Sequence, residues 1–261
     1  MYQGVLFAFP AILTSAVSDA TGRLSNAYNG AENAVVAAER YPFSVSVTLN
    51  NKHICGGFID KPRFIVTTAS CVCQKTTSQI QVTVGELSLV LPDSAELKLQ
   101  VQPITVHEAY DNTTRFNDVA MLEMSQVMEF GPSVNYIVFT EVSGSLAIIM
   151  GRGAFDETKM MSIELRGARI NSPASCDVFS TDVFDEKTMF CWGRSGYDSG
   201  VRPCQYDEGS PLFYPTFATT LYATGIVSKN LGCGDGHIFE TIYTWPMVYN
   251  DWILRVGGPQ H

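Results

Sequence analysis

The chain has 261 residues, of which 46% are hydrophobic and 16% are charged, which is enough to bury a sizeable core in one compact domain or two small domains in contact. The formal net charge is -9. Because the chain is acidic and has no Lys/Arg cluster, its composition argues against nucleic acid, heparin or anionic membranes as partners.

The N-terminal stretch MYQGVLFAFPAILTSAVSDA is typical of a secretory signal. Val5–Val17 is mostly apolar, but it is shorter than the ~20 residues of a membrane-spanning helix. Ala16 and Ser18 place small residues at the usual cleavage spacing. We therefore expect a signal peptide over 1–18, a short pro-segment over 19–26 and a secreted mature protein. A buried N-terminal strand is the alternative, since no Lys or Arg precedes the apolar run.

Alternating apolar and polar residues dominate the rest of the chain and predict short strands separated by polar or Gly-rich turns. The first predicted strands are Phe43–Asn50, Arg63–Ala69, Gln79–Leu91, Glu96–His107 and Asp118–Met124. The later ones are Ser145–Gly151, Met160–Ile170, Pro211–Pro215, Leu221–Ser228 and His237–Thr244. Pro246–Val256 alone has helical spacing. This pattern favours an all-β sandwich or barrel.

Seven cysteines follow the predicted signal, so several should pair in an oxidising compartment and the odd count leaves one over. Cys71 and Cys73 lie too close together for the usual spacing of zinc ligands. We therefore expect neither a metal site nor a cofactor.

Several segments, in order along the chain, resemble motifs of the chymotrypsin/trypsin-like serine proteases (peptidase S1). They are YPFSVSVTLNNKHICGGFID with FIVTTASCV, NDVAMLEM, CQYDEGSPLF, GIVSKNLGCG and HIFETIYTWPMVYNDWI. The resemblance runs from about Asn29 to Val256. It implies an all-β fold of two six-stranded antiparallel β-barrels, at about 27–135 and 136–245, with a C-terminal α-helix, a tail over 257–261 and the active site between the barrels.

The resemblance also implies how the cysteines pair. Cys55–Cys71 would close the loop below the first site, whereas Cys176–Cys191 and Cys204–Cys233 would brace the walls of the substrate pocket. Each closure is typically worth ~2–4 kcal/mol. Cys73 is then left over, either as a spare thiol or as an intermolecular link in a protein that is otherwise a monomer.

The family cleaves peptides with a Ser-His-Asp relay. Matched position by position, the histidine falls on Ser70 and the nucleophilic serine on Glu208, so Asp118 alone survives. A serine hydroxyl has no useful basicity near neutral pH, and a carboxylate repels the oxyanion beside which it would sit. The resemblance therefore leads to a catalytically inactive homologue.

The positions around the relay are altered as well. Tyr206 replaces the glycine whose N–H helps to form the oxyanion hole. Arg202 lies at the floor of the pocket, where trypsin-like members carry an aspartate. Lys229 and Asn230 replace Trp and Gly in one wall, and His237 falls where a glycine keeps the pocket open. We expect this pocket to be filled or blocked.

The residues that activate members of this family by cleavage near the N-terminus are also altered. Asp207 matches the aspartate that binds the new N-terminal amine in active members, but no residue of SNAYNGAEN follows a basic cleavage site. The hypothesis is that His53 holds Asp207 instead, as in the family's zymogens.

The function expected from these residues is that of a secreted, inactive serine protease homologue that binds proteins as a decoy or regulator. It resembles the inactivated protease paralogues of parasitic mites, which interfere with host defence. Two alternatives stay open, namely a hydrolase that uses the carboxylates of Asp118 and Glu208, and a structural or storage protein. Asn112 begins an Asn-Thr-Thr glycosylation sequon in a polar loop.

Overall fold

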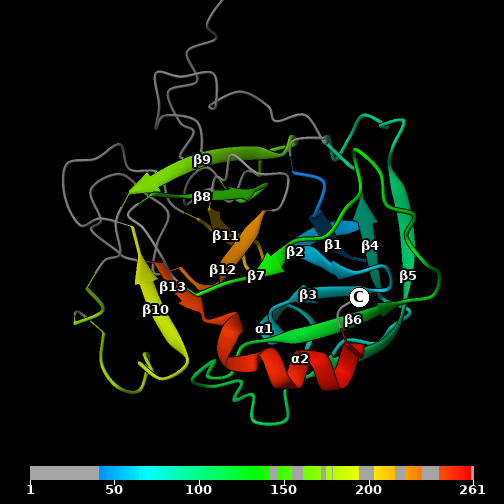
Figure 1. Ribbon diagram of the computed structural model, residues 1–261. Helices are drawn as coiled ribbons and strands as arrows, with labels where there is room; N and C mark the ends of the chain where they lie inside the picture. The colour runs from blue at the N-terminus through cyan, green and yellow to red at the C-terminus, as the bar shows by residue number, and fades with distance from the viewer. Residues whose placement is uncertain are drawn as a thin grey trace, which may run out of the picture.

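The strands form two sheets that lie side by side in the computed structural model, and a short C-terminal helix returns to the first of them (Figure 1). The structure describes residues 41–141, 146–154, 161–171, 175–177, 179–193, 203–214, 221–230 and 241–259. The predicted signal peptide and pro-segment, Arg202, Cys233 and His237 lie outside these residues.

The first sheet is a closed barrel in which every pairing is antiparallel, in the order β1-β2-β3-β6-β5-β4. Its strands are β1 (Ser44–Leu49), β2 (Lys52–Lys61), β3 (Phe64–Thr67), β4 (Ile80–Val84), β5 (Leu97–Val106) and β6 (Ala120–Met124). Alternate apolar side chains, such as Val45 and Val47 of β1, point inward and are buried in the barrel core.

The second sheet has seven strands and runs in the order β10-β13-β12-β11-β8-β9, with β7 pairing parallel to β12. The strands are β7 (Val138–Phe139), β8 (Leu146–Gly151), β9 (Arg166–Asn171), β10 (Met189–Trp192), β11 (Pro211–Tyr214), β12 (Tyr222–Lys229) and β13 (Thr241–Thr244). Within the described part of the chain, β9 and β10 end the sheet without pairing to each other. The mostly antiparallel, two-sheet architecture confirms the predicted fold class.

Two predicted strands are shorter than their apolar patterns indicate. The strand predicted over Met160–Ile170 begins only at Arg166, where β9 starts. The Gln79–Leu91 pattern continues beyond β4, but the strand ends at Val84. Gly85 follows with a φ of 66°, and the Asp93 carboxylate then accepts the backbone N–H groups of Leu87 and Ser88, at 2.7 and 3.1 Å. A side chain five and six residues further along the sequence thus takes over donors that a strand ladder would use.

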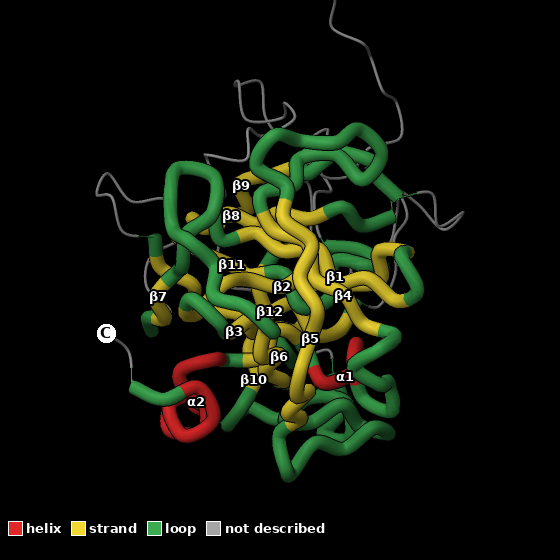
Figure 2. The backbone as a smooth tube through the Cα atoms, turned by 90° about the vertical axis from the view of Figure 1, so that its right-hand side faces the viewer, coloured by secondary structure: helices red, strands yellow, loops and turns green. Residues whose placement is uncertain are grey.

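The predicted C-terminal helix begins with a tighter turn. Residues Pro246–Tyr249 form a 3₁₀ turn (η3), and α2 (Asn250–Gly257) continues it. Trp252 and Ile253 are the buried residues of α2, which lies against β6 at the lower end of the molecule (Figure 1, Figure 2).

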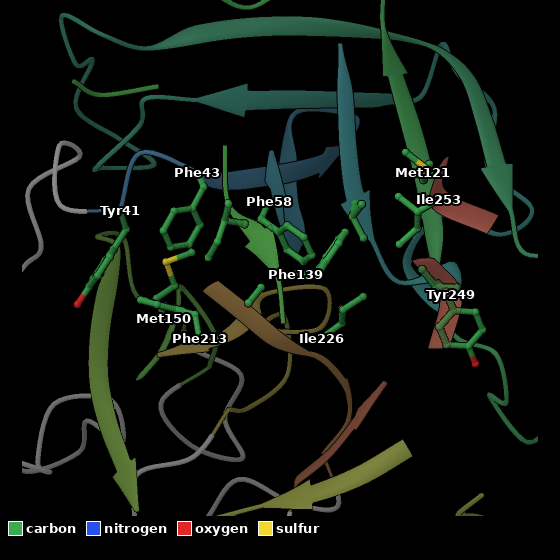
Figure 3. Close-up of a cluster of buried hydrophobic side chains, with 14 of the residues drawn as sticks. Tyr41, Phe43, Phe58, Met121, Phe139, Met150, Phe213, Ile226, Tyr249 and Ile253 are labelled. Carbon is green, nitrogen blue, oxygen red and sulfur yellow. The ribbon is translucent and has the colours of Figure 1, made fainter. Parts of the chain in front are cut away.

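The two sheets share a buried apolar cluster (Figure 3). Phe43, which precedes β1, and Phe213 of β11 meet edge to face with ring centroids 5.1 Å apart. Phe58 of β2 contacts Phe139 of β7 in the same way at 5.7 Å. Because aromatic rings bury large apolar areas and prefer this geometry, the cluster joins the two halves of the chain.

Disulfides fix two further segments. Cys55 of β2 is bonded to Cys71 of α1 (Ala69–Val72), and Cys176 is bonded to Cys191 of β10. Cys204 is also disulfide-bonded, but its expected partner Cys233 lies outside the described residues. Cys73 is a free thiol.

Replacing Phe213 with alanine should destabilise the whole molecule, because this side chain is fully buried between the sheets. We expect Phe213→Ala to lower the free energy of unfolding by about 3–5 kcal/mol, the usual cost of such a truncation. Urea unfolding followed by circular dichroism measures it. Phe130→Ala is the matched control, since that ring is 38% exposed, and it should cost less than half as much. Equal losses would contradict a shared core.

Candidate functional site

Asp118 is buried where the two sheets meet, immediately before β6. Its Oδ1 accepts the backbone N–H of Ser70 at 2.7 Å, and its Oδ2 accepts the Ser70 hydroxyl at 3.0 Å. The Ser228 hydroxyl of β12 donates to the same Oδ2 at 2.6 Å. Burial raises the pKa of Asp118, and these three hydrogen bonds oppose the rise. The structure thus brings Ser70 and Asp118 together. The Ser70 hydroxyl donates to the carboxylate, but it offers no basic nitrogen that could accept a proton from a nucleophile.

Glu208 binds backbone N–H groups of its own turn. Its Oε2 accepts the N–H of Tyr206 at 2.8 Å, and its own backbone N–H also donates to the carboxylate. Asn230 Nδ2 lies 3.5 Å from Oε1 on the other side. Burial raises the pKa of Glu208, while the two N–H donors oppose the rise. The carboxylate therefore occupies the two donors that would bind a developing negative charge in an acyl-transfer site.

The turn from Cys204 to Gly209 is held rigidly between the two sheets. The Gly56 N–H of β2 donates to the Glu208 carbonyl at 2.8 Å, and the Gly209 N–H donates to Val227 of β12 at 2.8 Å. Gly209 has a φ of 84°, and a Cβ there would lie 2.4 Å from the Gly56 carbonyl oxygen. Tyr206 takes a φ of 77° although it is not a glycine. The close packing thus fixes the turn shape and directs the Tyr206 N–H toward Glu208.

Asn230, at the end of β12, crosses from its strand to this turn. Its Nδ2 donates to the Cys204 carbonyl at 3.0 Å. The resemblance predicts that these two segments are walls of a pocket, and the Asn230 amide joins them directly. Arg202 and His237, predicted to lie at the floor and side of the same pocket, fall outside the described residues.

Lys229, the last residue of β12, precedes Asn230 and is packed against other side chains. Its Nζ donates to the Val183 carbonyl and lies 5.1 Å from the centre of the Phe116 ring, a cation–π contact. Lys229 is only 7% exposed. Burial lowers the pKa of Lys229 to about 8, although the negative charge of Asp118 acts to raise it. Lys229 is thus packed within the protein rather than extended into solvent.

The hypothesis that His53 holds Asp207 is wrong in this structure. The His53 ring nitrogens lie 2.8 Å from the Ser46 hydroxyl and 3.1 Å from the Tyr206 carbonyl oxygen. Both Asp207 oxygens instead accept backbone N–H groups, from Gly153 at 2.6 Å and from Cys204 at 2.9 Å. Because the backbone already satisfies the carboxylate, His53 supports the turn one residue earlier.

The sequence did not predict a buried ion pair between Arg152 and Glu86. Arg152 is 2% exposed, and its Nη2 donates to the Glu86 carbonyl and lies 3.5 Å from Glu86 Oε2. Burial and the charge of Arg152 lower the pKa of His53 to about 3, so this ring is neutral at physiological pH. Burial raises the pKa of Asp207 to about 7, although the backbone N–H groups that donate to its carboxylate act to lower it. No local pattern around Arg152 in the sequence marks it as buried.

Among the residues that the structure describes, no group of three or more His, Cys, Asp or Glu side chains is placed to hold a metal ion. In the same residues, no helix has the length and apolar character needed to cross a membrane.

The raised pKa of Glu208 predicts how stability depends on pH. The folded state binds a proton more tightly than the unfolded state, so its contribution to stability is complete below the unfolded pKa of about 4.5 and is lost as pH rises through the folded pKa. We expect Glu208→Gln to flatten the fall in unfolding free energy above pH 4.5, by at most about 1.4 kcal/mol per pH unit. Urea titrations between pH 4.5 and pH 8 measure it.

The exposed Glu129 offers a matched control, since Glu129→Gln should leave the pH dependence as in the unaltered chain. The prediction fails if Glu208→Gln and Glu129→Gln give the same curves.

Comparisons with known proteins agree with this geometry. The Trypsin family matches residues 30–253. The chain is 30% identical to complement factor I of Rattus norvegicus over 230 residues, which is 84% of this chain but 37% of that relative's length. It is 30% identical to hypodermin-B of Hypoderma lineatum over 226 residues, or 83% of each chain, and 26% identical to trypsin alpha of Drosophila erecta over 226 residues, or 84% of this chain and 83% of that one. With this match and this fold, the chain belongs to the trypsin family of serine proteases.

Proposed function

We propose that this chain is a proteolytically inactive member of the trypsin family that acts by binding another protein. The observation that carries the proposal is the Glu208 carboxylate on the Tyr206 N–H, at 2.8 Å. Acyl transfer needs this donor for the negative charge that develops on the substrate carbonyl oxygen. A fixed carboxylate in this place both blocks the donor and repels that charge.

The position of the general base supports the same conclusion. The mechanism requires a group that takes the proton of the nucleophile and is oriented by Asp118. Ser70 keeps the hydrogen bond to Asp118, but its side chain has no basic nitrogen to accept a proton from a nucleophile. With both the base and the nucleophile replaced, the relay loses the groups whose removal typically costs several orders of magnitude in rate.

Substrate access is restricted as well. The contact of Asn230 with the Cys204 carbonyl spans the pocket between its walls, and Lys229 packs on Phe116 beside it. A peptide side chain would have to displace a buried hydrogen bond and a buried cation before it could enter. These contacts favour the exposed loops as the functional surface, on a scaffold that tolerates changes in its loops.

A hydrolase that uses two carboxylates has less support. Such chemistry needs Asp118 and Glu208 to share a proton or a substrate. Asp118 is bound by Ser70 and Ser228, whereas Glu208 is bound by donors of its own turn. No hydrogen bond joins the two carboxylates among the described residues.

We expect the protein to bind its partner outside the cell. Disulfides persist in oxidising compartments, and Cys55–Cys71 and Cys176–Cys191 are both formed. A decoy or regulator secreted into another organism's tissue fluid fits these features, as does a regulator in the animal's own fluids.

Peptide hydrolysis tests the inactive state. We expect the purified chain to show no turnover of a broad peptide library and no labelling by a fluorophosphonate probe, both unchanged in Glu208→Ala. The positive control is the double variant Ser70→His with Glu208→Ser, which should be labelled at least about 100-fold faster than Glu208→Ser alone, since a general base contributes ~10²–10⁴ in rate. Turnover that Glu208→Ala abolishes but Glu129→Ala spares would overturn the proposal.

Capture of a partner tests the binding role. The immobilised chain is exposed to extracellular fluid of its source organism and of any host, and each retained protein is purified and titrated back. We expect at least one partner to bind saturably and to be displaced by the free folded chain but not by the reduced, unfolded chain. If no saturable partner is found, a structural or storage role is favoured instead.

A further inference from the structure

We propose that Asn112 carries an N-linked glycan and that this glycan covers the free thiol of Cys73. The inference does not depend on the proposed function, because it rests on the loop between β5 and β6 rather than on the cleft. The inference rests on three observations, namely the sequon Asn112-Thr113-Thr114, the hydrogen bonds of the Asn112 amide and the position of Cys73.

The sequon lies at the tip of an exposed loop. Asn112 and Thr113 are exposed, and the loop closes through a bridge between Asp111 and Phe116. The Asp111 carboxylate accepts the N–H of Thr113 at 2.7 Å and that of Thr114 at 3.3 Å, which forms a local turn. Glycosylation requires an accessible sequon on a surface loop, and this turn presents one.

The two ends of the Asn112 amide differ in their contacts. The oxygen Oδ1 accepts the Tyr110 hydroxyl at 3.2 Å and the Cys73 thiol at 3.5 Å. The nitrogen Nδ2 makes no hydrogen bond to any of the described residues. Because a glycan is attached through Nδ2, the folded loop accommodates it without loss of an existing hydrogen bond.

The chemistry of attachment is consistent with the disulfides. Both modifications belong to the secretory route, and the chain forms Cys55–Cys71 and Cys176–Cys191. The co-reactant is an oligosaccharide linked to a lipid diphosphate. A bond forms between Nδ2 and the first sugar carbon, the bond from that carbon to the diphosphate breaks, and one Nδ2 proton passes to a base of the transferring enzyme.

The consequence concerns Cys73. Its Sγ is within hydrogen-bond distance of the amide that would bear the glycan, and the residue is half-buried and unpaired. A free thiol in an oxidising compartment is open to pairing with another molecule. A glycan on the amide whose oxygen lies 3.5 Å from this thiol would shield it and keep the chain monomeric.

The full chain is expressed in insect cells and recovered from medium and cells, and its intact mass is measured before and after peptide-N-glycosidase F. We expect the unaltered chain to lose the mass of one glycan and Thr114→Ala to lose none. Thr113→Ala and Thr114→Ser both keep the sequon and serve as controls that should remain glycosylated. Absence of a glycan from Asn112 in every fraction of the unaltered chain overturns the proposal.

Shielding is measured by the rate at which a bulky maleimide labels native Cys73. Labelling should be several-fold slower in the glycosylated chain than in Thr114→Ala, and Thr113→Ala should behave like the unaltered chain. Thr114→Ser keeps both the sequon and the hydroxyl that accepts the Phe116 N–H at 3.3 Å, so it should label as slowly as the unaltered chain. The unaltered chain after native treatment with peptide-N-glycosidase F keeps this hydroxyl but loses the glycan, and it separates loss of the glycan from loss of the loop. Equal rates in glycosylated and unglycosylated chains would refute the shielding of Cys73.

Discussion

The buried contact between the two sheets is the constraint on which the rest of this structure depends. Phe43 and Phe213 meet across it, and Asp118 receives hydroxyl hydrogen bonds from Ser70 of the first half and Ser228 of the second. The aromatic pair supplies buried apolar area, whereas the carboxylate requires donors from both halves at fixed positions. Together they hold the turn from Cys204 to Gly209 in one place relative to α1.

That placement is also held by contacts that do not involve the side chains at 70 and 208. The turn is anchored through backbone groups of Gly56 and Gly209, which do not depend on the side chain at 208. The side chain at 70 is likewise not needed to hold α1, because the Cys55–Cys71 disulfide ties that helix to β2. These contacts of the turn and α1 are therefore independent of the side chains at 70 and 208. Glu208 then adds contacts of its own, since its carboxylate finds donors already directed toward it.

Much of this arrangement could be predicted from local patterns. The alternation in Phe43–Asn50 and Asp118–Met124 predicts strands that the structure contains, and the motifs around Cys55 and Cys204 predict the family. The strand predicted to reach Leu91 stops at Val84, because the Asp93 carboxylate takes the next backbone donors. The buried ion pair of Arg152 and Glu86 could not be predicted, since it joins residues 66 positions apart.

The sequence by itself determined the strands, the family and the identity of the side chains at 70, 118 and 208, because each follows from spacing and residue type along the chain. The tertiary structure alone decided where those side chains find partners. It directed the Glu208 carboxylate to the Tyr206 N–H, and Asn230 to the Cys204 carbonyl. It also gave His53 the Tyr206 carbonyl rather than Asp207. The physical reason is that a buried polar group takes whichever partner the packed backbone brings within hydrogen-bond distance, and sequence spacing does not encode that distance.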